Sequence, residues 1–519
     1  MTTRRLLRGG LVADGIGSQT QPGDVLVVDA EIIAVGPGVG DGVDAEIIDL
    51  APGSVVCPGF IDAHVHAEHQ LAVDGLVPGA LAQGVTTLVV GQDGSSWIGG
   101  SADTVSYLDD YFGPVNGPAP AACGCRLDDY TRLVNGRLGH NVAVLASQGT
   151  IRHGLAGTSD RPLSDAEITA ARLAVERALE QGAVGLSSGL DYVPSRFGGV
   201  AEIAAMATPL AEAGRPYVSH LRAYGASVRA GLAELGEVGR IANVPVHASH
   251  LWGPPEAIDT ALSEIASEGA GVSFDMYPYV RSSTILAMLV LPAEVQNGGI
   301  PATLRRLNDP DTRAALLRTD RFSAAYLANV VLGSLPERLA DHAGQTITEA
   351  AADTGKPLGE WTLDLLIDSA LQVGAQLDRP ALTEADLRAI VTHRRHCAGS
   401  DGIYAGQRPH PRAYGAFARL AGYYGYDVNG SGGTDYQLLV RHLSTNAADA
   451  YRLDQRGRLA CGKAADICVL APSGLIERSS FDDPCRLADG AALVLVNGVP
   501  VWADGAPVPG ARPGSVITS

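Results

Sequence analysis

The sequence predicts an α/β protein in which a (β/α)8 TIM-like barrel carries a small β-sandwich domain built from both termini. One observation behind this prediction is that strand-like and helix-like segments alternate from about residue 58 to 459. Repeated strand-helix units imply a parallel sheet, and about eight of them imply a closed barrel. A second observation is that residues 1–57 and 460–519 share another pattern, short apolar runs separated by turns rich in Gly, Pro and Asp.

The two ends of the chain are predicted to form one domain. Strand-like runs such as 24–30 near the N-terminus resemble the run 491–503 near the C-terminus. Within the latter, Asn497 followed by Gly498 is typical of a two-residue hairpin turn. Because the two ends resemble each other and flank a different middle, we expect them to build one β-sandwich.

The middle segment is predicted to supply the barrel. Residues 164–182 are the clearest helix, with a capping Ser164, acidic residues in the first turn and a terminal Gly182. Residues from about 290 to 390 exceed one strand-helix unit and are largely helical in pattern, so we expect an inserted helical subdomain or a long loop over the barrel mouth. Strand candidates lie at 86–91, 141–146, 184–187, 215–220, 243–250, 271–277 and 328–332.

Composition narrows the classes of function. The chain has 519 residues, is 46% hydrophobic and 18% charged, and has no apolar run long enough to cross a bilayer. Its formal charge of -19, without a Lys/Arg cluster, argues against a nucleic-acid partner and favours a small-molecule substrate. The N-terminus does not read as a secretion signal, and seven cysteines fit reduced thiols in the cytoplasm. Cys123 and Cys125 form the only close pair and are interpreted as loop or core thiols.

Histidines stand at the ends of several strand-like runs. His64 and His66 close an apolar run and are one residue apart, so they point to the same side of a strand. His220 and His250 close two later runs, and Asp401 follows another. In a parallel barrel the carboxyl ends of the strands converge on one mouth. Two polar residues in a surface turn would explain the first pair alone, but the full set predicts a shared metal site.

Several motifs are spread along nearly the whole chain. They are Pro58-Gly-Phe-Ile-Asp-Ala-His-Val-His, Gln83-Gly-Val-Thr-Thr, Tyr277-Pro-Tyr followed by Ser282-Ser-Thr, Gly399-Ser-Asp-Gly leading to Arg408-Pro-His-Pro-Arg, and Gly457-Arg-Leu-Ala-Cys-Gly-Lys-Ala-Ala-Asp-Ile-Cys-Val-Leu. Together these motifs resemble the amidohydrolase superfamily, and within it the D-aminoacylase (N-acyl-D-amino-acid deacylase) branch.

The resemblance implies a zinc centre of one or two ions. His64 and His66 would serve one metal position, His220 and His250 the other, and Asp401 would lie beside the metal-bound water as general base and general acid. The branch usually has a cysteine ligand where this chain has Asp93. A carboxylate can bridge two ions through its two oxygens and is harder than a thiolate, so we expect even occupancy and tolerance of Mn2+ or Co2+. The alternative is that Asp93 only caps the following turn.

The resemblance also indicates substrate-binding residues. Tyr192 and Tyr279 match positions that line the pocket in the family, where a phenol can donate to a carbonyl or carboxylate oxygen. Arg222, two residues after His220, is placed to hold a carboxylate, with a surface ion pair as the equally weighted alternative. Ser283 is a candidate helper.

A second departure from the branch concerns the residue two places after His250. The branch often carries a lysine there, and this chain has Trp252. The loss of that cation suggests a bulkier or less charged substrate, unless Arg281 or Arg196 supplies a replacement charge.

The leading prediction is therefore zinc-dependent hydrolysis of the amide bond of an N-acyl-D-amino acid or a related N-acyl amine. One alternative is a linear amide hydrolase for a larger, specialised substrate. Another is a cyclic amide hydrolase of the hydantoinase or dihydroorotase type, against which the absence of a strand-end bridging lysine counts. A barrel that has lost catalysis and serves as a binding partner is the non-enzymatic alternative, and retention of all four histidines with Asp401 argues against it.

Overall fold

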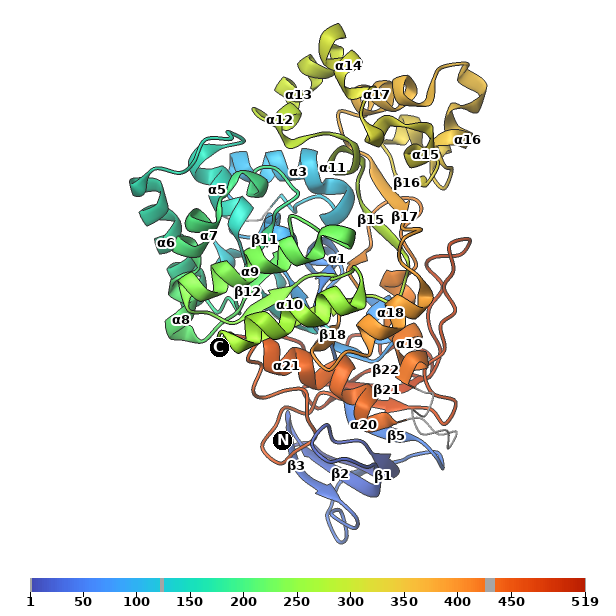
Figure 1. The fold of residues 1–519 in the computed structure, drawn as a ribbon. Coiled ribbons are helices and arrows are strands. Elements are labelled where there is room, and N and C mark those ends of the chain that lie inside the picture. Colours follow the sequence, from blue (N-terminus) through green and yellow to red (C-terminus); the bar gives the residue numbers. More distant parts are fainter. Residues whose placement is uncertain (1, 122–125, 425–434, 519) are drawn as a thin grey trace.

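The computed structural model describes residues 2–121, 126–424 and 435–518 (Figure 1). Cys123 and Cys125, the predicted loop or core thiols, lie outside the described residues. Within the described part, no helix is both long and apolar enough to cross a membrane.

Parallel strands form the centre of the molecule. A 3-stranded sheet of order β6-β8-β9 is continued by a 6-stranded sheet of order β10-β11-β12-β13-β14-β18, because only Leu145 separates β9 from β10. Ala63, directly after β6, donates its N–H to the Ala398 carbonyl of β18 at 3.0 Å, which returns the order to its start, as a (β/α)8 barrel requires. The strands are β6 (Phe60–Asp62), β8 (Val85–Val90), β9 (Asn141–Val144), β10 (Ala146–Ser147), β11 (Leu186–Gly189), β12 (Tyr217–His220), β13 (Val246–Ala248), β14 (Val272–Met276) and β18 (His396–Ala398).

Helices connect these strands and cover them from outside. The predicted helix is α6 (Asp165–Glu180): Ser164 Oγ accepts the N–H of Glu167, and the Glu167 carboxylate accepts the N–H of Ser164, so both ends of the capping box are made. Its Ala171 and Val175 are buried against the barrel. Other covering helices are α3 (Ala102–Asn116), α5 (Gln148–Ala156), α7 (Val200–Ala207), α9 (Val228–Ala242), α10 (Pro255–Ser267), α18 (Glu384–Val391) and α19 (Arg412–Tyr424).

A separate layer projects from the carboxyl side of the barrel between β14 and β18, at the top of Figure 1. It contains an antiparallel sheet of order β15-β17-β16, made of β15 (Arg281–Ile285), β16 (Val330–Ser334) and β17 (Gly374–Asp378). The sequence predicts a helical subdomain or a long loop here, and a barrel strand at 328–332. The structure instead places that strand in the inserted sheet, because its partners lie about 45 residues away and local periodicity does not reveal them.

The helices of this inserted layer are short and pack around their own apolar cluster, which includes Leu307, Leu332 and Leu366. They are α11 (Leu286–Val290), α12 (Ala293–Gln296), α13 (Gly299–Asn308), α14 (Pro310–Leu316), α15 (Ala324–Leu327), α16 (Ile347–Ala351) and α17 (Leu358–Asp368).

Both termini contribute to one hydrogen-bonded sheet of nine strands, at the bottom of Figure 1. The junction is the antiparallel pair β5–β20, in which Cys57 lies opposite Cys468. Asn497 and Gly498, both with positive φ, form the predicted hairpin turn. Among the described residues, the two termini therefore share one continuous sheet, whereas the sequence predicted that they form a β-sandwich. Its strands are β1 (Arg4–Val12), β2 (Gln21–Val28), β3 (Glu31–Gly36), β4 (Glu46–Asp49), β5 (Val55–Pro58), β20 (Ile467–Leu470), β21 (Ala491–Val496), β22 (Val499–Ala503) and β23 (Ala506–Pro507).

Candidate metal centre and its pocket

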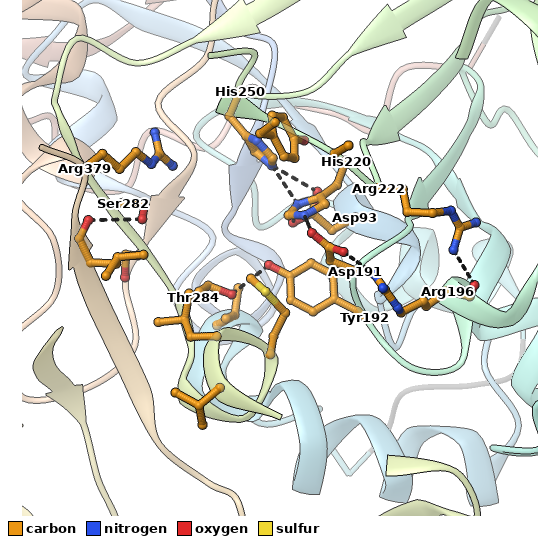
Figure 2. A pocket seen from close by; sticks show the side chains of 18 of the residues that line it. Asp93, Asp191, Tyr192, Arg196, His220, Arg222, His250, Ser282, Thr284 and Arg379 are labelled. Atoms are coloured by element: carbon orange, nitrogen blue, oxygen red, sulfur yellow. Dashed lines mark hydrogen bonds and ion pairs between the residues drawn. The ribbon is translucent and has the colours of Figure 1, made fainter. Parts of the chain in front are cut away.

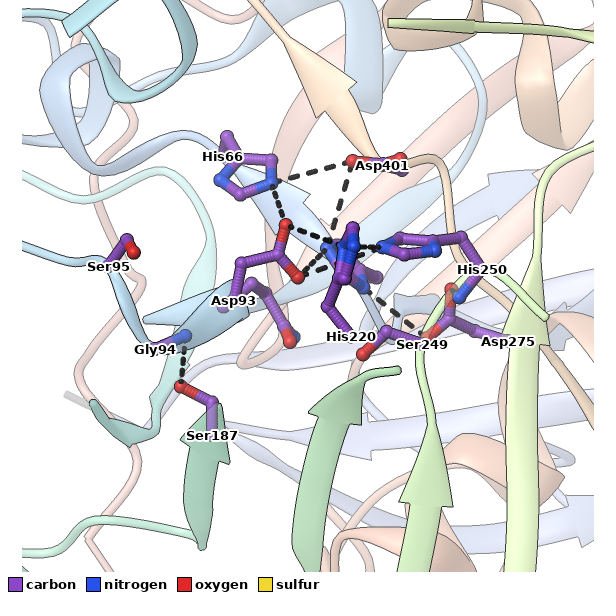
Figure 3. A network of polar contacts seen from close by, with 12 residues as sticks. His66, Asp93, Gly94, Ser95, Ser187, His220, Ser249, His250, Asp275 and Asp401 are labelled. Atoms are coloured by element: carbon purple, nitrogen blue, oxygen red, sulfur yellow. Dashed lines mark hydrogen bonds and ion pairs between the residues drawn. The ribbon is translucent and has the colours of Figure 1, made fainter. Parts of the chain in front are cut away.

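The six residues predicted as metal ligands converge at the carboxyl ends of the barrel strands (Figure 3). His66 ends the short strand β7 (Val65–His66), which pairs in parallel with β19 (Gly402–Ile403) just after Asp401. Asp401 also donates its N–H to the His64 carbonyl at 2.7 Å, so the first and last barrel strands fix the two ligand segments together. His220 ends β12, and His250 follows β13.

Three of these residues adopt a backbone conformation that L-residues rarely use. Asp93, in the short helix η1 (Gln92–Gly94) after β8, has φ 55°, His250 has φ 35° and Asp401 has φ 47°. Backbone strain of this kind is retained where surrounding structure imposes it, and it gathers at functional sites. The strained turns aim all three side chains at one point.

The Asp93 carboxylate lies between the four histidines. Its Oδ1 is 3.7 Å from His64 Nε2 and 3.7 Å from His250 Nε2. Its Oδ2 is 3.7 Å from His66 Nε2 and 3.8 Å from His220 Nδ1. These distances exceed a hydrogen bond but allow an ion between each oxygen and its histidines, since zinc binds N and O ligands at about 2.0–2.2 Å.

Asp401 faces the same centre from the other side. Its Oδ1 is 3.4 Å from His66 Nε2 and 3.7 Å from His64 Nε2, while its Oδ2 is 2.8 Å from Nη1 of Arg412. Burial by itself would raise the pKa of Asp401, but the charge of Arg412 and the neighbouring histidines lower it to about 2. Asp401 is therefore a carboxylate with one oxygen held by a buried cation and the other oxygen directed at the histidines.

The donor set fits a divalent metal ion. Two groups of three ligand atoms each lie within 4.8 Å of one another: His64, Asp93 and His250, and His64, His66 and Asp401. Among the described residues, His64 Nε2 and Asp93 Oδ1 are buried and have no hydrogen-bond partner. Leaving such atoms unsatisfied is costly, and a cation would satisfy both.

The local charge also favours a cation. Burial opposes protonation of His64, yet Asp275 and two further carboxylates raise the pKa of His64 to about 10. Burial likewise opposes protonation of His220, while Asp191 and Asp93 raise its pKa to about 9. Protons occupy these histidines in the absence of another cation, so metal binding must displace protons and depends on pH.

Neighbouring polar groups orient the histidines. Asp275, in β14, places Oδ2 3.4 Å from His64 Nδ1 and accepts the backbone N–H of His250 at 2.9 Å through Oδ1. His66 Nδ1 lies 2.8 Å from Asn116 Oδ1. The contact of Asn116 with the second ring nitrogen of His66 fixes the tautomer of this ring and leaves its Nε2 for a metal, while Asp275 places a negative charge beside His64.

A cavity of about 730 Å3 opens onto this centre (Figure 2). His66, Asp93, His220, His250 and Asp401 are among the residues that line it. Side chains from the inserted layer form an apolar wall that runs from Met288 to Ala293 and continues in Tyr326 and Leu377. Arranged as a polar end beside a long apolar wall, the cavity suits a small amphipathic molecule.

Four of the six predicted substrate-binding residues line the cavity: Tyr192, Arg222, Trp252 and Ser283. Tyr279 and Arg281 are outside its lining. The phenol of Tyr279 donates to Glu477 at 2.5 Å. Arg281 stands opposite Asp378 in the β15–β17 register and makes two bonds to its carboxylate, at 2.7 and 2.9 Å, so a cross-strand ion pair holds it away from the cavity.

The donors of Arg222 are largely engaged within the protein. Its Nε donates to Glu234 at 3.1 Å, and its Nη1 and Nη2 donate to the carbonyls of Arg196 and Gly198 at 2.6 and 2.9 Å. Arg196, the other suggested source of charge, is paired with Asp191. These contacts favour the structural alternative for Arg222 over a carboxylate-binding role.

Sequence reasoning missed several residues of the site. Arg412 closes the quoted Arg408-Pro-His-Pro-Arg motif, so a signal was present, although its partner Asp401 was not evident. Tyr224, whose ring centroid is 5.3 Å from His220, and Arg379, which lines the cavity from the inserted layer, follow no motif. Asp191, with Oδ2 3.5 Å from His220 Nε2, gave no sequence signal either.

Comparisons with known proteins show which proteins the chain is similar to. The model of the Amidohydrolase family matches residues 260–502. D-aminoacylase from Alcaligenes xylosoxydans xylosoxydans is 29% identical over 512 residues, covering 96% of this chain and 94% of the relative. Solved structures of D-aminoacylase, one concerned with its binuclear metal centre, superpose with a TM-score of 0.81 at 26% identity and cover 99% of both chains. N-acyl-D-glutamate deacylase from Bordetella bronchiseptica, complexed with zinc and a phosphonate inhibitor, also has a TM-score of 0.81, at 25% identity and 99% coverage of both chains.

Proposed function

Because this chain belongs to the amidohydrolase family, in the branch that includes D-aminoacylase, we propose that it hydrolyses the amide bond of N-acyl-D-amino acids or related N-acyl amines with bound zinc. One observation carries the proposal: Asp93 and Asp401 direct carboxylate oxygens at four buried histidines at the end of a cavity. The overall fold class, a TIM-type barrel with an additional domain, is that of D-aminoacylase.

His64, His66, His220 and His250 would hold one or two zinc ions together with Asp93 and Asp401. The two oxygens of Asp93 face different pairs of histidines, which supports a bridging role over the turn-capping alternative. The pairs are His64 with His250 and His66 with His220, so they differ from the predicted division of His64 with His66 and His220 with His250. Mn2+ or Co2+ would fit the same oxygen and nitrogen donors. When bound, such an ion lowers the pKa of water and polarises a carbonyl group.

Asp401 supplies the proton transfers. Its Oδ1 faces the centre, so it accepts a proton from the attacking water and returns that proton to the departing amine nitrogen. The products are then a carboxylic acid and a free amine. Arg412 keeps Asp401 ionised and fixed in position, and Tyr192, whose phenol lies 2.8 Å from Thr284 Oγ1, borders the substrate cavity.

The apolar wall formed by residues 288–293 supports an apolar acyl group or side chain in the substrate. The composition, in which seven cysteines fit reduced thiols, supports the cytoplasm as the compartment.

The proposal is tested by measuring amine release from a panel of N-acyl-D- and N-acyl-L-amino acids, with hydantoin as a cyclic amide, using zinc-reconstituted protein. We expect release from D substrates. Asp401→Asn keeps the shape of the side chain but cannot accept a proton, so it should lower kcat by about 100- to 10,000-fold. Most of the zinc should be retained, because the four histidines and Asp93 remain in place. Activity confined to hydantoin, or an Asp401→Asn variant as active as the parent, would contradict the proposal.

A further inference from the structure

Arg379 lies where the inserted sheet meets the cavity. It directly follows β17, whose last residue, Asp378, turns to Arg281. Successive side chains of an extended strand point to opposite faces, so Arg379 turns the other way, and it lines the cavity. Figure 2 shows its guanidinium extending from the inserted layer toward the space below His250.

Aromatic rings hold the guanidinium in place. Its Cζ is 4.7 Å from the centroid of Trp252 and 5.7 Å from that of Tyr277, and its Nη2 donates to the Tyr277 phenol at 2.8 Å. Cation–π stacking and a hydrogen bond restrict the side chain before a ligand arrives. Less rotational freedom is then lost on binding.

No described carboxylate neutralises Arg379. Within residues 2–121, 126–424 and 435–518 it forms no ion pair, and its Nη1 is buried without a hydrogen-bond partner. Arg196 and Arg222 line the same cavity but are paired with Asp191 and Glu234. Arg379 is therefore a fixed cation with a donor still to be satisfied, which is the requirement for binding an anion from the cavity.

A continuous aromatic wall links this cation to the candidate metal centre. Tyr224 lies 5.4 Å from His250 and stacks parallel to Trp252, at a centroid distance of 6.4 Å, and Arg379 lies over the ring of Trp252. Trp252 itself is two residues after His250. His250, Tyr224, Trp252 and Arg379 thus line one side of the cavity that opens onto the candidate metal centre.

From this arrangement we propose that Arg379, stacked on Trp252, binds the substrate carboxylate and makes the site selective for N-acyl amino acids over uncharged N-acyl amines. The inference rests on the proposed function, because it assigns the anionic part of that substrate. The proposal also accounts for Trp252. Trp252 carries no charge itself, but its ring supports the cation of Arg379. The carboxylate lies at Arg379 while the acyl amide lies at the histidines.

The test compares N-acetyl-D-leucine with N-acetyl-D-leucinamide, in which the carboxylate is replaced by a neutral amide, and follows acetate release from both. We expect the parent to prefer the acid. Arg379→Met should lower kcat/KM for the acid by about 10- to 100-fold, chiefly through KM, and change the value for the leucinamide less than about threefold. Arg379→Lys, which keeps the charge but not the paired donors, should lie between them.

The matched control is Arg388→Met. Arg388 stacks on Tyr423 at 4.8 Å but lies on α18, outside the cavity lining, so this variant should leave both substrates unchanged. Equal losses of kcat/KM for the acid and the leucinamide in Arg379→Met, or no loss for the acid, would overturn the role of Arg379 as the anchor of the substrate carboxylate. If Arg379→Met does not fold, an Arg379→Lys variant with parent selectivity and parent KM would overturn it as well.

Binding separates this inference from the proposed function. If the parent releases no acetate from any N-acyl-D-amino acid, the proposed function fails, and the anchor is then measured by calorimetry with N-tosyl-D-leucine, which is not hydrolysed, and with its carboxamide. A preference for the acid that Arg379→Met abolishes supports the anchor. Equal affinities of the parent for both compounds refute it, whatever the outcome of the activity assay.

Discussion

The ion pair between Arg412 and Asp401 makes a quantitative prediction about stability. Arg412 is fully buried and Asp401 is 6% exposed, with 2.8 Å between Arg412 Nη1 and Asp401 Oδ2. Arg412→Met removes the cation and leaves a buried carboxylate, a change that costs about 3–5 kcal/mol of unfolding free energy. With an unfolding entropy of about 2.1 cal/mol/K per residue, the 519-residue chain has about 1.1 kcal/mol/K. The melting temperature should therefore fall by about 3–5 °C.

The assay is thermal unfolding of metal-free protein, followed by circular dichroism at pH 7.5. Arg419→Met is the control, because Arg419 lies on the same helix but is partly exposed. It pairs with Glu384 and Glu477 and stacks on Tyr279, and partly solvated pairs of this kind contribute less than about 1 kcal/mol each. Saturating zinc should reduce the deficit of Arg412→Met, since a bound cation compensates the charge of Asp401. If Arg412→Met melts within 1 °C of Arg419→Met in the metal-free state, about the resolution of the assay, the reasoning about the buried pair is refuted.

Two further predictions concern metal content and pH. Asp93→Ala removes the oxygens that face both pairs of histidines, so the affinity for zinc should fall by more than about 100-fold. Zinc per chain after dialysis, measured by mass spectrometry, should then be lower than in the parent. A zinc content equal to that of the parent would contradict a bridging role of Asp93. Burial lowers the pKa of His140 to about 4, so this ring stays neutral in the folded state while the unfolded chain takes up a proton below about pH 6.5. The stability it contributes is thus present above pH 6.5 and falls by about 2 kcal/mol between pH 7 and pH 5. In His140→Gln, urea unfolding should show a smaller difference in unfolding free energy between pH 7 and pH 5. An unchanged difference would argue against a neutral, buried His140 as its cause.

The barrel and the convergence of the predicted metal-binding residues could be predicted from the sequence. Strand-end histidines are recognisable because side-chain alternation is local, and because parallel strands bring their carboxyl ends to one edge whatever lies between them. That is why His64, His66, His220, His250 and Asp401 meet as expected. That both termini contribute strands to one domain could also be predicted, because each hairpin is encoded within a few residues.

The partner of each arginine near the cavity could not be predicted from the sequence. Arg281 appeared suitable from its position, but Asp378, 97 residues later, neutralises it across two strands of the inserted sheet. Arg412, on a helix that follows the last barrel strand, pairs with Asp401. Arg379, directly after β17, stacks on Trp252, which lies 127 residues earlier in the chain. A guanidinium binds the nearest acceptor in space, and spatial proximity across an inserted layer is set by packing, so residue type and spacing in the sequence could not reveal it.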